Sequence, residues 1–205
     1  MGNPACSVKT EARGAVFLDR DGTVNEEVGY LSDLSKLRLL PGAAASIRRL
    51  NQAGIPIVIV TNQSGVARGY FPESFVHKTH TLLQELLQRE GARLDGIYYC
   101  PHHPKAGNSS YTAVCDCRKP ATGLLDRAAK DLGLALDRSY MVGDKWSDVE
   151  LGHRAGSRSI LVITGFSADD PGNARPDHVR DPDFVAHDLV EAVDWILQRE
   201  RETPA

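Results

Sequence analysis

Aspartate residues follow two of the predicted strands at points where they could bind a metal ion and a phosphate group. Asp19 and Asp21 come directly after the apolar run 15–18, and Asp144 follows the run 140–142. Carboxylate oxygens are the ligands that Mg²⁺ prefers. Two carboxylates two residues apart can also divide the chemistry, with one acting as a nucleophile and the other donating and accepting a proton. The pattern therefore indicates phosphoryl transfer.

A threonine and a lysine complete this set. Thr61 follows the apolar run 55–60, and Lys119 precedes a predicted helix. A hydroxyl and backbone N–H groups can bind phosphoryl oxygens, and a lysine can offset the charge on them. Each residue alone also fits a turn, a helix cap or a solvated surface. Their order and their common place at the strand ends favour an active site.

Strands and helices alternate along the chain, and this order predicts where the polar residues meet. Apolar runs predict strands at 15–18, 55–60, 97–99, 140–142 and 160–163, and helical spacing predicts helices at about 42–53, 72–91, 123–132, 148–155 and 189–199. The Pro- and Asp-rich stretch 167–183 is expected to be a surface loop. The fold class is α/β, with a doubly wound, mostly parallel, Rossmann-like sheet. Right-handed crossovers place all strand carboxyl ends at one edge, where ligands bind.

Length and composition set limits on the class of protein. The 205 residues predict one domain, 1–205, with a structured core at about 14–199. Lysine and arginine number 24 against 27 acidic residues, so nucleic acid is not an expected partner. The longest aliphatic run has six residues and contains a proline, and the start lacks a signal-peptide pattern. We expect a soluble, cytoplasmic monomer that does not bind membranes.

Three of the four cysteines cluster, whereas Cys6 stands alone. Cys100-x-His102, twelve residues and Cys115-x-Cys117 supply three thiolates and one imidazole. This is a complete tetrahedral Zn²⁺ set with no open position, which predicts a structural site that pins the loop. The adjacent His103 is a competing ligand that spacing does not exclude. Free thiols or a Cys115–Cys117 disulfide would also fit the pattern, although a reducing cytosol disfavours the disulfide.

The Asp-x-Asp-Gly-Thr motif at 19–23, Thr61, Lys119 and the Gly-Asp-x-x-x-Asp motif at 143–148 resemble the four motifs of the haloacid dehalogenase superfamily of phosphatases. The resemblance implies that Asp19 is the nucleophile and that Asp21 is the acid/base, with its backbone carbonyl on Mg²⁺. It implies that Thr61 and Lys119 stabilise the phosphoryl group. It further implies that Asp144 is a metal ligand and that Asp148 lies behind the ligands.

Other stretches are similar to a narrower group within that superfamily, the sugar-bisphosphate phosphatases. They include TNQSGVARGYF at 61–71, CPHHP at 100–104, CDCRKP at 115–120 and MVGDK at 141–145. This resemblance implies a phosphorylated sugar as substrate, in contact with Glu27, Val28, Gly29, Tyr30, Asn62, Gln63, Ser64 and Arg118. Phosphatases of histidinol phosphate share the zinc loop and remain an alternative, as does a broader sugar-phosphate phosphatase. A phosphate-binding module without catalysis is disfavoured because the chain retains Asp19, Asp21, Thr61, Lys119 and Asp144.

The spacing of the motifs leaves no room for a separate cap domain. Only 39 residues lie between Asp21 and Thr61, and 57 lie between Thr61 and Lys119. We therefore expect specificity to come from the loops 23–36, 64–71 and 100–118. Arg118 has the fork geometry to pair with a second phosphate.

Overall fold

A computed structural model describes residues 12–107, 110–165 and 173–202 of the chain. Six parallel strands form one sheet in the order β3-β2-β1-β4-β5-β6. The strands are β1 (Val16–Leu18), β2 (Ile57–Asn62), β3 (Gly96–Cys100), β4 (Tyr140–Gly143), β5 (Arg158–Val162) and β6 (Phe184–Ala186). The order reverses at β1, which lies between β2 and β4. This is the doubly wound α/β fold that the sequence predicts.

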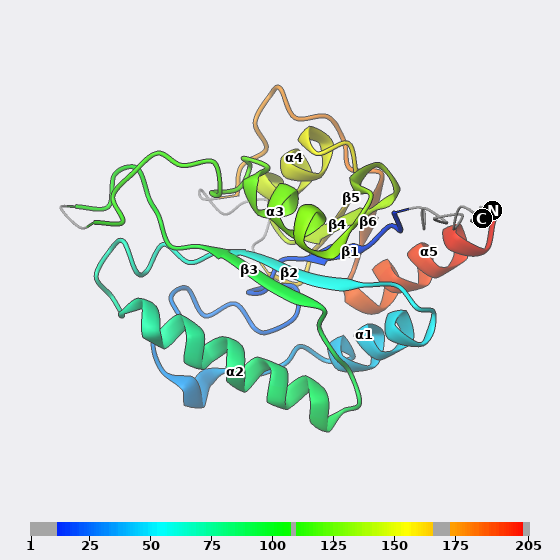
Figure 1. Ribbon diagram of the computed structural model, residues 1–205, viewed down its shortest axis with the longest axis horizontal. Helices are drawn as coiled ribbons and strands as arrows, with labels where there is room; N and C mark the ends of the chain where they lie inside the picture. Colours follow the sequence, from blue (N-terminus) through cyan, green and yellow to red (C-terminus); the bar gives the residue numbers. More distant parts are fainter. Residues whose placement is uncertain (1–11, 108–109, 166–172, 203–205) are drawn as a thin grey trace, which may run out of the picture.

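Helices cover both faces of the sheet (Figure 1). One face carries α3 (Gly123–Leu132) and α4 (Trp146–Arg154), and the other carries α1 (Ala43–Gln52), α2 (Glu73–Arg89) and α5 (Leu189–Glu202). Short 3₁₀ helices span Leu34–Lys36 and Leu136–Arg138. None of the helices in the described ranges is long and apolar enough to cross a membrane.

Alternate residues of the central strands build two cores. Val16 and Leu18 pack with α1, α2 and α5, whereas Phe17 packs with α3 on the opposite face. Successive side chains of a strand point to opposite faces, so a strand covered on both sides must be apolar throughout. All three residues of β1 are fully buried, and the next residue, Asp19, is therefore held on a rigid strand end.

The predicted strands differ from the observed ones by one missing strand and by several shifted ends, such as those of the fifth strand, predicted at 160–163 and observed at Arg158–Val162. The sequence pattern does not predict β6, which has only three residues and lies at the sheet edge, where Val185 is 52% exposed. The second strand was predicted at 55–60, whereas β2 runs from Ile57 to Asn62. Pairing with β3 extends β2, because Thr61 lies opposite Tyr99 and Asn62 opposite Cys100. A single-sequence pattern does not report such a partner.

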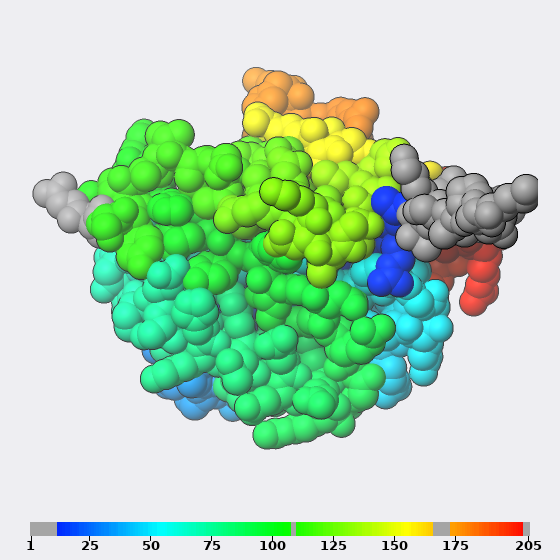
Figure 2. All heavy atoms as spheres, in the orientation of Figure 1, coloured from blue at the N-terminus to red at the C-terminus, as the bar shows by residue number. Residues whose placement is uncertain are grey.

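The segments between the motifs are short, as expected for a fold with no cap. The only helices in residues 19–56 are the first 3₁₀ helix and α1, joined by turns and isolated bridges, and the residues described between β2 and α3 contain α2, β3 and the loop 101–122. That loop projects at one end of the molecule, beyond β3 (Figures 1 and 2). Cys6 and part of the predicted loop 167–183 lie outside the described residues.

Candidate active site and Cys/His cluster

The predicted catalytic residues meet at the carboxyl edge of the sheet. Asp19 follows β1, Thr61 is the penultimate residue of β2, and Asp144 follows β4. The strand register places these residues at a similar height along the sheet, because Leu18 pairs with both Ile59 and Val142. Asp19, Thr61 and Asp144, together with Asp21 and Lys119, are called the catalytic edge below.

Lys119 links two parts of the catalytic edge through its ammonium group. Its Nζ lies 2.8 Å from Asp19 Oδ1 and 2.6 Å from Asp148 Oδ1. It also donates to the Val60 carbonyl at 3.0 Å. Burial alone would lower the pKa of Lys119, but the carboxylates of Asp148 and Asp19 outweigh burial and raise it. The lysine is therefore a fixed positive charge beside the proposed nucleophile.

Asp19, Asp144 and Asp148 form a carboxylate cluster in which one oxygen from each residue lies within 4.8 Å of the other two. Burial and the neighbouring Asp19 carboxylate raise the pKa of Asp148 to about 6, although the Lys119 ammonium group acts to lower it. Three buried carboxylates offset by one ammonium group form a donor set suited to a hard divalent cation. Asp144 also has close glycine neighbours, since a Cβ at Gly22 or at Gly165 would collide with its carboxylate. The residues present therefore fit Mg²⁺.

Asp21 lies at the wall of the cavity, and side-chain donors surround its carboxylate. Arg20 forms a salt bridge to it, with Nη2 2.6 Å from Oδ2. Asn25 donates to Oδ1 at 2.9 Å, and Gln63 donates to Oδ2 at 2.9 Å. Burial opposes ionisation, but these partners hold the pKa of Asp21 below its ordinary value. Gln63 also donates to the Thr61 hydroxyl at 3.0 Å and so connects two residues of the catalytic edge.

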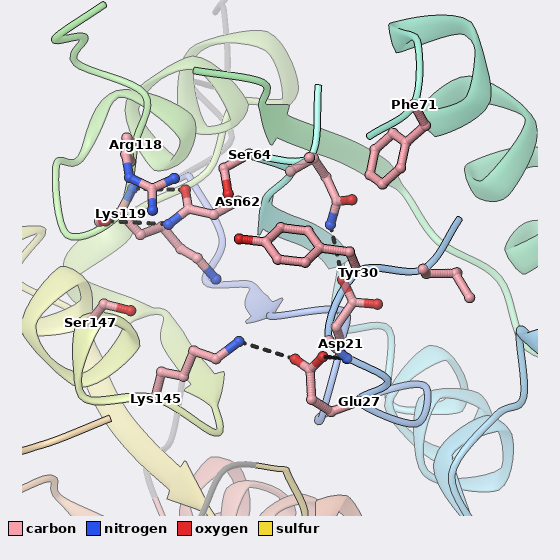
Figure 3. Close-up of a pocket in the computed structure, with 14 residues that line it drawn as sticks. Asp21, Glu27, Tyr30, Asn62, Ser64, Phe71, Arg118, Lys119, Lys145 and Ser147 are labelled. Carbon is pink, nitrogen blue, oxygen red and sulfur yellow. Dashed lines mark hydrogen bonds and ion pairs between the residues drawn. The ribbon is translucent and has the colours of Figure 1, made fainter. Parts of the chain in front are cut away.

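A cavity of about 470 Å³ opens above this edge (Figure 3). Seven of the eight predicted substrate contacts line it: Glu27, Gly29, Tyr30, Asn62, Gln63, Ser64 and Arg118. Val28 does not, and its side chain is 42% exposed. The lining comes from all three loops to which specificity was attributed, together with the start of α4.

The sequence analysis missed Lys145 as a cavity residue. Its Nζ points into the cavity and lies 3.2 Å from Glu27 Oε2 (Figure 3). Burial would lower the pKa of Lys145, but the carboxylates of Asp19, Asp144 and Glu27 raise it. The sequence did hold a signal for this role, because Lys145 directly follows Asp144, a predicted metal ligand at a strand end. Lys145 and Arg118 give the cavity two cations besides Lys119.

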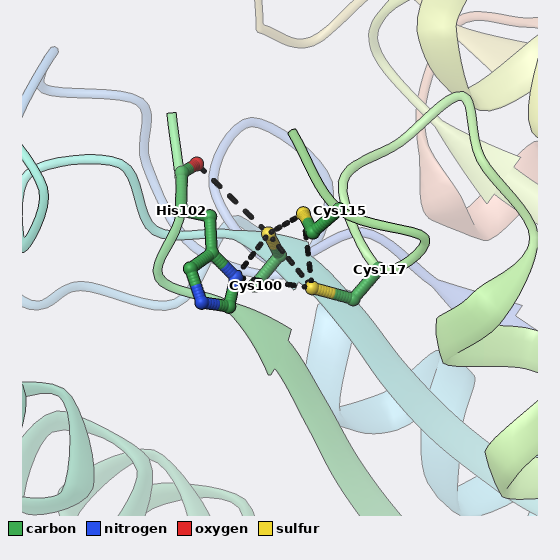
Figure 4. A group of neighbouring side chains, drawn as sticks. All are labelled: Cys100, His102, Cys115 and Cys117. Carbon is green, nitrogen blue, oxygen red and sulfur yellow. Dashed lines mark hydrogen bonds between the residues drawn. The ribbon is translucent and has the colours of Figure 1, made fainter. Parts of the chain in front are cut away.

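The predicted zinc ligands lie together, and the four residues Cys100, His102, Cys115 and Cys117 are called the Cys/His cluster below (Figure 4). Cys117 Sγ lies 3.2 Å from Cys100 Sγ and 3.3 Å from Cys115 Sγ, and His102 Nδ1 lies 3.3 Å from Cys117 Sγ. Tetrahedral Zn–S bonds of about 2.3 Å would set neighbouring sulfurs about 3.8 Å apart. The donor set fits zinc.

The structure places neither His103 nor a disulfide at this cluster. His103 points elsewhere, since its Nε2 lies 3.1 Å from Arg68 Nη2 and its Nδ1 accepts from the Lys105 backbone at 3.1 Å. The sulfurs of Cys115 and Cys117 are not bonded, because a disulfide requires about 2.05 Å.

The Cys/His cluster is joined to the catalytic edge through the chain itself. Arg118 follows Cys117 and donates from Nη1 to the His102 carbonyl at 3.2 Å. Lys119 comes next, and its backbone N–H donates to Asn62 Oδ1 at 3.1 Å. On its other side the loop is tied to α2, because the Tyr111 hydroxyl donates to Glu73 at 2.7 Å.

Comparisons with known proteins agree with this arrangement. A family model for HAD-hydrolase-like proteins matches residues 116–192. The chain is 48% identical to a D-glycero-D-manno-heptose-1,7-bisphosphate 7-phosphatase of Thermosynechococcus vestitus over 90% of this chain and 95% of the relative. It is 41% identical to a D-glycero-beta-D-manno-heptose-1,7-bisphosphate 7-phosphatase of Haemophilus ducreyi, over 89% and 97% of the two chains.

A solved structure is similar throughout its length. It is the D,D-heptose 1,7-bisphosphate phosphatase of B. bronchiseptica complexed with magnesium and phosphate, with a TM-score of 0.78 and 32% identity over 91% of this chain and 99% of the other. A putative HAD-like phosphatase from Mesorhizobium loti matches with the same TM-score of 0.78, at 38% identity over 95% of this chain and 89% of the other.

Proposed function

This chain belongs to the family of the heptose 1,7-bisphosphate 7-phosphatases, which are HAD-like hydrolases, and we propose that it removes the 7-phosphate of D-glycero-D-manno-heptose 1,7-bisphosphate. The products are heptose 1-phosphate and inorganic phosphate. The observation that carries this assignment is the cavity that holds Asp21, Lys119, Lys145 and Arg118 and has no cap domain above it in the described residues. One end of the cavity suits phosphoryl transfer, and the rest offers cations for a second phosphate.

We propose two chemical steps for the catalytic edge. A carboxylate oxygen of Asp19 bonds to the phosphorus while the bond from phosphorus to the sugar oxygen breaks. Asp21 must carry a proton in the substrate complex, although Arg20 favours its charged form, and it gives that proton to the leaving oxygen. Asp21 then takes a proton from water, whose oxygen bonds to phosphorus while the Asp19–phosphorus bond breaks. This returns both side chains to their starting state.

The remaining residues of the catalytic edge bind the phosphoryl oxygens. Lys119 is held 2.8 Å from Asp19 and offsets negative charge where it concentrates. Thr61 adds a hydroxyl donor, and its orientation depends on Gln63. Asp19, Asp144 and the Asp21 backbone carbonyl would hold Mg²⁺, which supplies further positive charge at the phosphoryl group.

We propose that the Cys/His cluster binds one structural zinc ion. All four ligands are protein side chains, so no position is left for substrate. The role of the ion would be to fix the loop 100–118 and thereby Arg118, whose guanidinium faces the cavity (Figure 3). The second phosphate of the substrate would then meet Arg118, with Lys145 as a further cation of the same cavity.

We propose that the protein acts as a single-domain monomer, since the described residues of one chain assemble both the catalytic edge and the cavity. Light scattering of the purified protein measures this directly.

A phosphatase screen tests the assignment. Purified protein with Mg²⁺ should release phosphate from the heptose 1,7-bisphosphates faster than from heptose 7-phosphate, and nuclear magnetic resonance should show the 1-phosphate retained. Both anomers belong in the screen, because the cavity does not by itself select one. Faster hydrolysis of histidinol phosphate than of either anomer would replace the heptose assignment with a histidinol-phosphate phosphatase.

A further inference from the structure

An arginine without access to solvent lies between the two aspartates of the Asp-x-Asp motif. Arg20 is 1% exposed and is the largest fully buried side chain among the described residues. A buried guanidinium costs free energy unless it is paired and hydrogen-bonded. The Asp-x-Asp pattern itself does not require any particular residue at this position, so its burial calls for a reason.

One edge of the Arg20 guanidinium holds Asp21. Nη2 contacts both carboxylate oxygens, at 2.9 Å from Oδ1 and 2.6 Å from Oδ2, and Nε lies 3.1 Å from Oδ1. Asn25 and Gln63 each contact one oxygen only. A planar fork that spans both oxygens fixes the plane of the carboxylate, which single donors do not.

The opposite edge of the guanidinium rests on α2. Nη1 lies 3.3 Å from Nε2 of His80, a buried residue of that helix. Burial first, and then the charge of Arg20, lower the pKa of His80 to about 3. A neutral imidazole accepts the Arg20 N–H at Nε2 and carries its own proton on Nδ1. The His80 ring in turn packs edge-on against Tyr99 of β3, with centroids 5.4 Å apart.

We propose that Arg20 is a positioning residue that fixes the orientation of Asp21, and that His80 acts through Arg20 by holding its far edge. This inference rests on the proposed function, in which Asp21 protonates the leaving oxygen. The Asp21 side chain is 17% exposed at the wall of an open cavity, and no described segment covers it. Without the fork, only the single hydrogen bonds from Asn25 and Gln63 restrain rotation of the carboxylate away from the leaving oxygen.

Leaving groups of different basicity separate this role from a general structural one. A sugar alkoxide needs a proton as it departs, whereas 4-nitrophenolate leaves without one. The ratio kcat/KM reports the first step, in which the leaving group departs. Arg20→Lys keeps the positive charge and loses the fork. It should lower kcat/KM for heptose bisphosphate by about 10- to 100-fold, the scale of a misplaced catalytic group, and should change the value for 4-nitrophenyl phosphate by less than about threefold.

A matched pair at His80 tests the second half of the proposal. His80→Leu removes the acceptor, and should lower kcat/KM for heptose bisphosphate by about tenfold, the lower end of the scale for one hydrogen bond to a charged group. His80→Gln places an amide oxygen near the position of Nε2 and should recover most of that loss. If Arg20→Lys does not fold, as judged by its melting curve, the His80 pair decides the question alone.

The same measurements distinguish a failure of the positioning role from a failure of the proposed phosphatase function. Wild-type protein and Asp21→Asn are run beside the variants with both esters. Normal wild-type activity, with equal losses on the two esters in Arg20→Lys and in His80→Leu, overturns the positioning role and leaves the function intact. A wild-type protein that releases no phosphate from any sugar phosphate overturns the function and the positioning role together.

Discussion

The catalytic edge and the Cys/His cluster are built in opposite ways. The catalytic edge collects residues from 19 to 144 out of separate loops and strand ends, and the parallel sheet brings them together. The Cys/His cluster lies within residues 100–117 and lacks a comparable frame, since only Cys100 belongs to a strand. The catalytic edge therefore depends on the buried sheet, whereas the Cys/His cluster depends on the ion that its ligands would bind.

The two regions should therefore respond differently to mutation, and the largest effect is expected at Asp19. Asp19→Asn should lower kcat by about 10⁴-fold or more, because an amide is a poor nucleophile. The melting temperature should change little, since Lys119 keeps its contact with Asp148. Phosphate release and thermal unfolding measure the two quantities. Turnover within tenfold of wild type would exclude the aspartyl-phosphate mechanism.

The reverse pattern, a loss of stability ahead of activity, is expected for the Cys/His cluster. Cys117→Ser should lose the zinc ion, and the free energy of unfolding should fall by about 4 kcal/mol if zinc is supplied at a thousandfold excess over its Kd. Elemental analysis and denaturant titration check this. His103→Ala is the matched control and should retain zinc, whereas His102→Ala should lose it. Protein made with zinc available that contains none would exclude the site.

Arg118 connects the two regions, so its variant should show a selective effect of intermediate size. A charge-assisted pair is worth about 1.5–3 kcal/mol, so Arg118→Ala should lower kcat/KM for the bisphosphate by about 10- to 150-fold more than for 4-nitrophenyl phosphate. Steady-state kinetics on both esters give the comparison. Equal losses would mean that Arg118 serves the catalytic edge in general and does not bind the second phosphate.

The smallest effect is expected where the loop is tied to α2. Tyr111→Phe removes the hydroxyl that donates to Glu73 and should lower the free energy of unfolding by about 1 kcal/mol. Hydrogen exchange should rise within the loop 100–118 and not in the sheet. Tyr70→Phe, at a residue that is 55% exposed, serves as the control and should leave both measurements unchanged.

The sequence by itself determined the alternation of strands and helices and the residue types at the strand ends. It did so because a strand buried on both faces must be apolar throughout, which makes Asp19, Thr61 and Asp144 conspicuous where the apolar runs stop. The spacing of the Cys/His cluster was visible for a similar reason, since its four residues lie in one short segment.

The tertiary structure decided what depends on neighbours distant in the chain. Strand β6 and the extension of β2 to Asn62 follow from pairing with β5 and β3, which no single-sequence pattern reports. The selection of His102 over His103 follows from where the loop folds back to Cys117. Lys145 and Arg20 read as ordinary charged residues in the sequence, because only packing shows one turned into the cavity toward Glu27 and the other buried between Asp21 and His80.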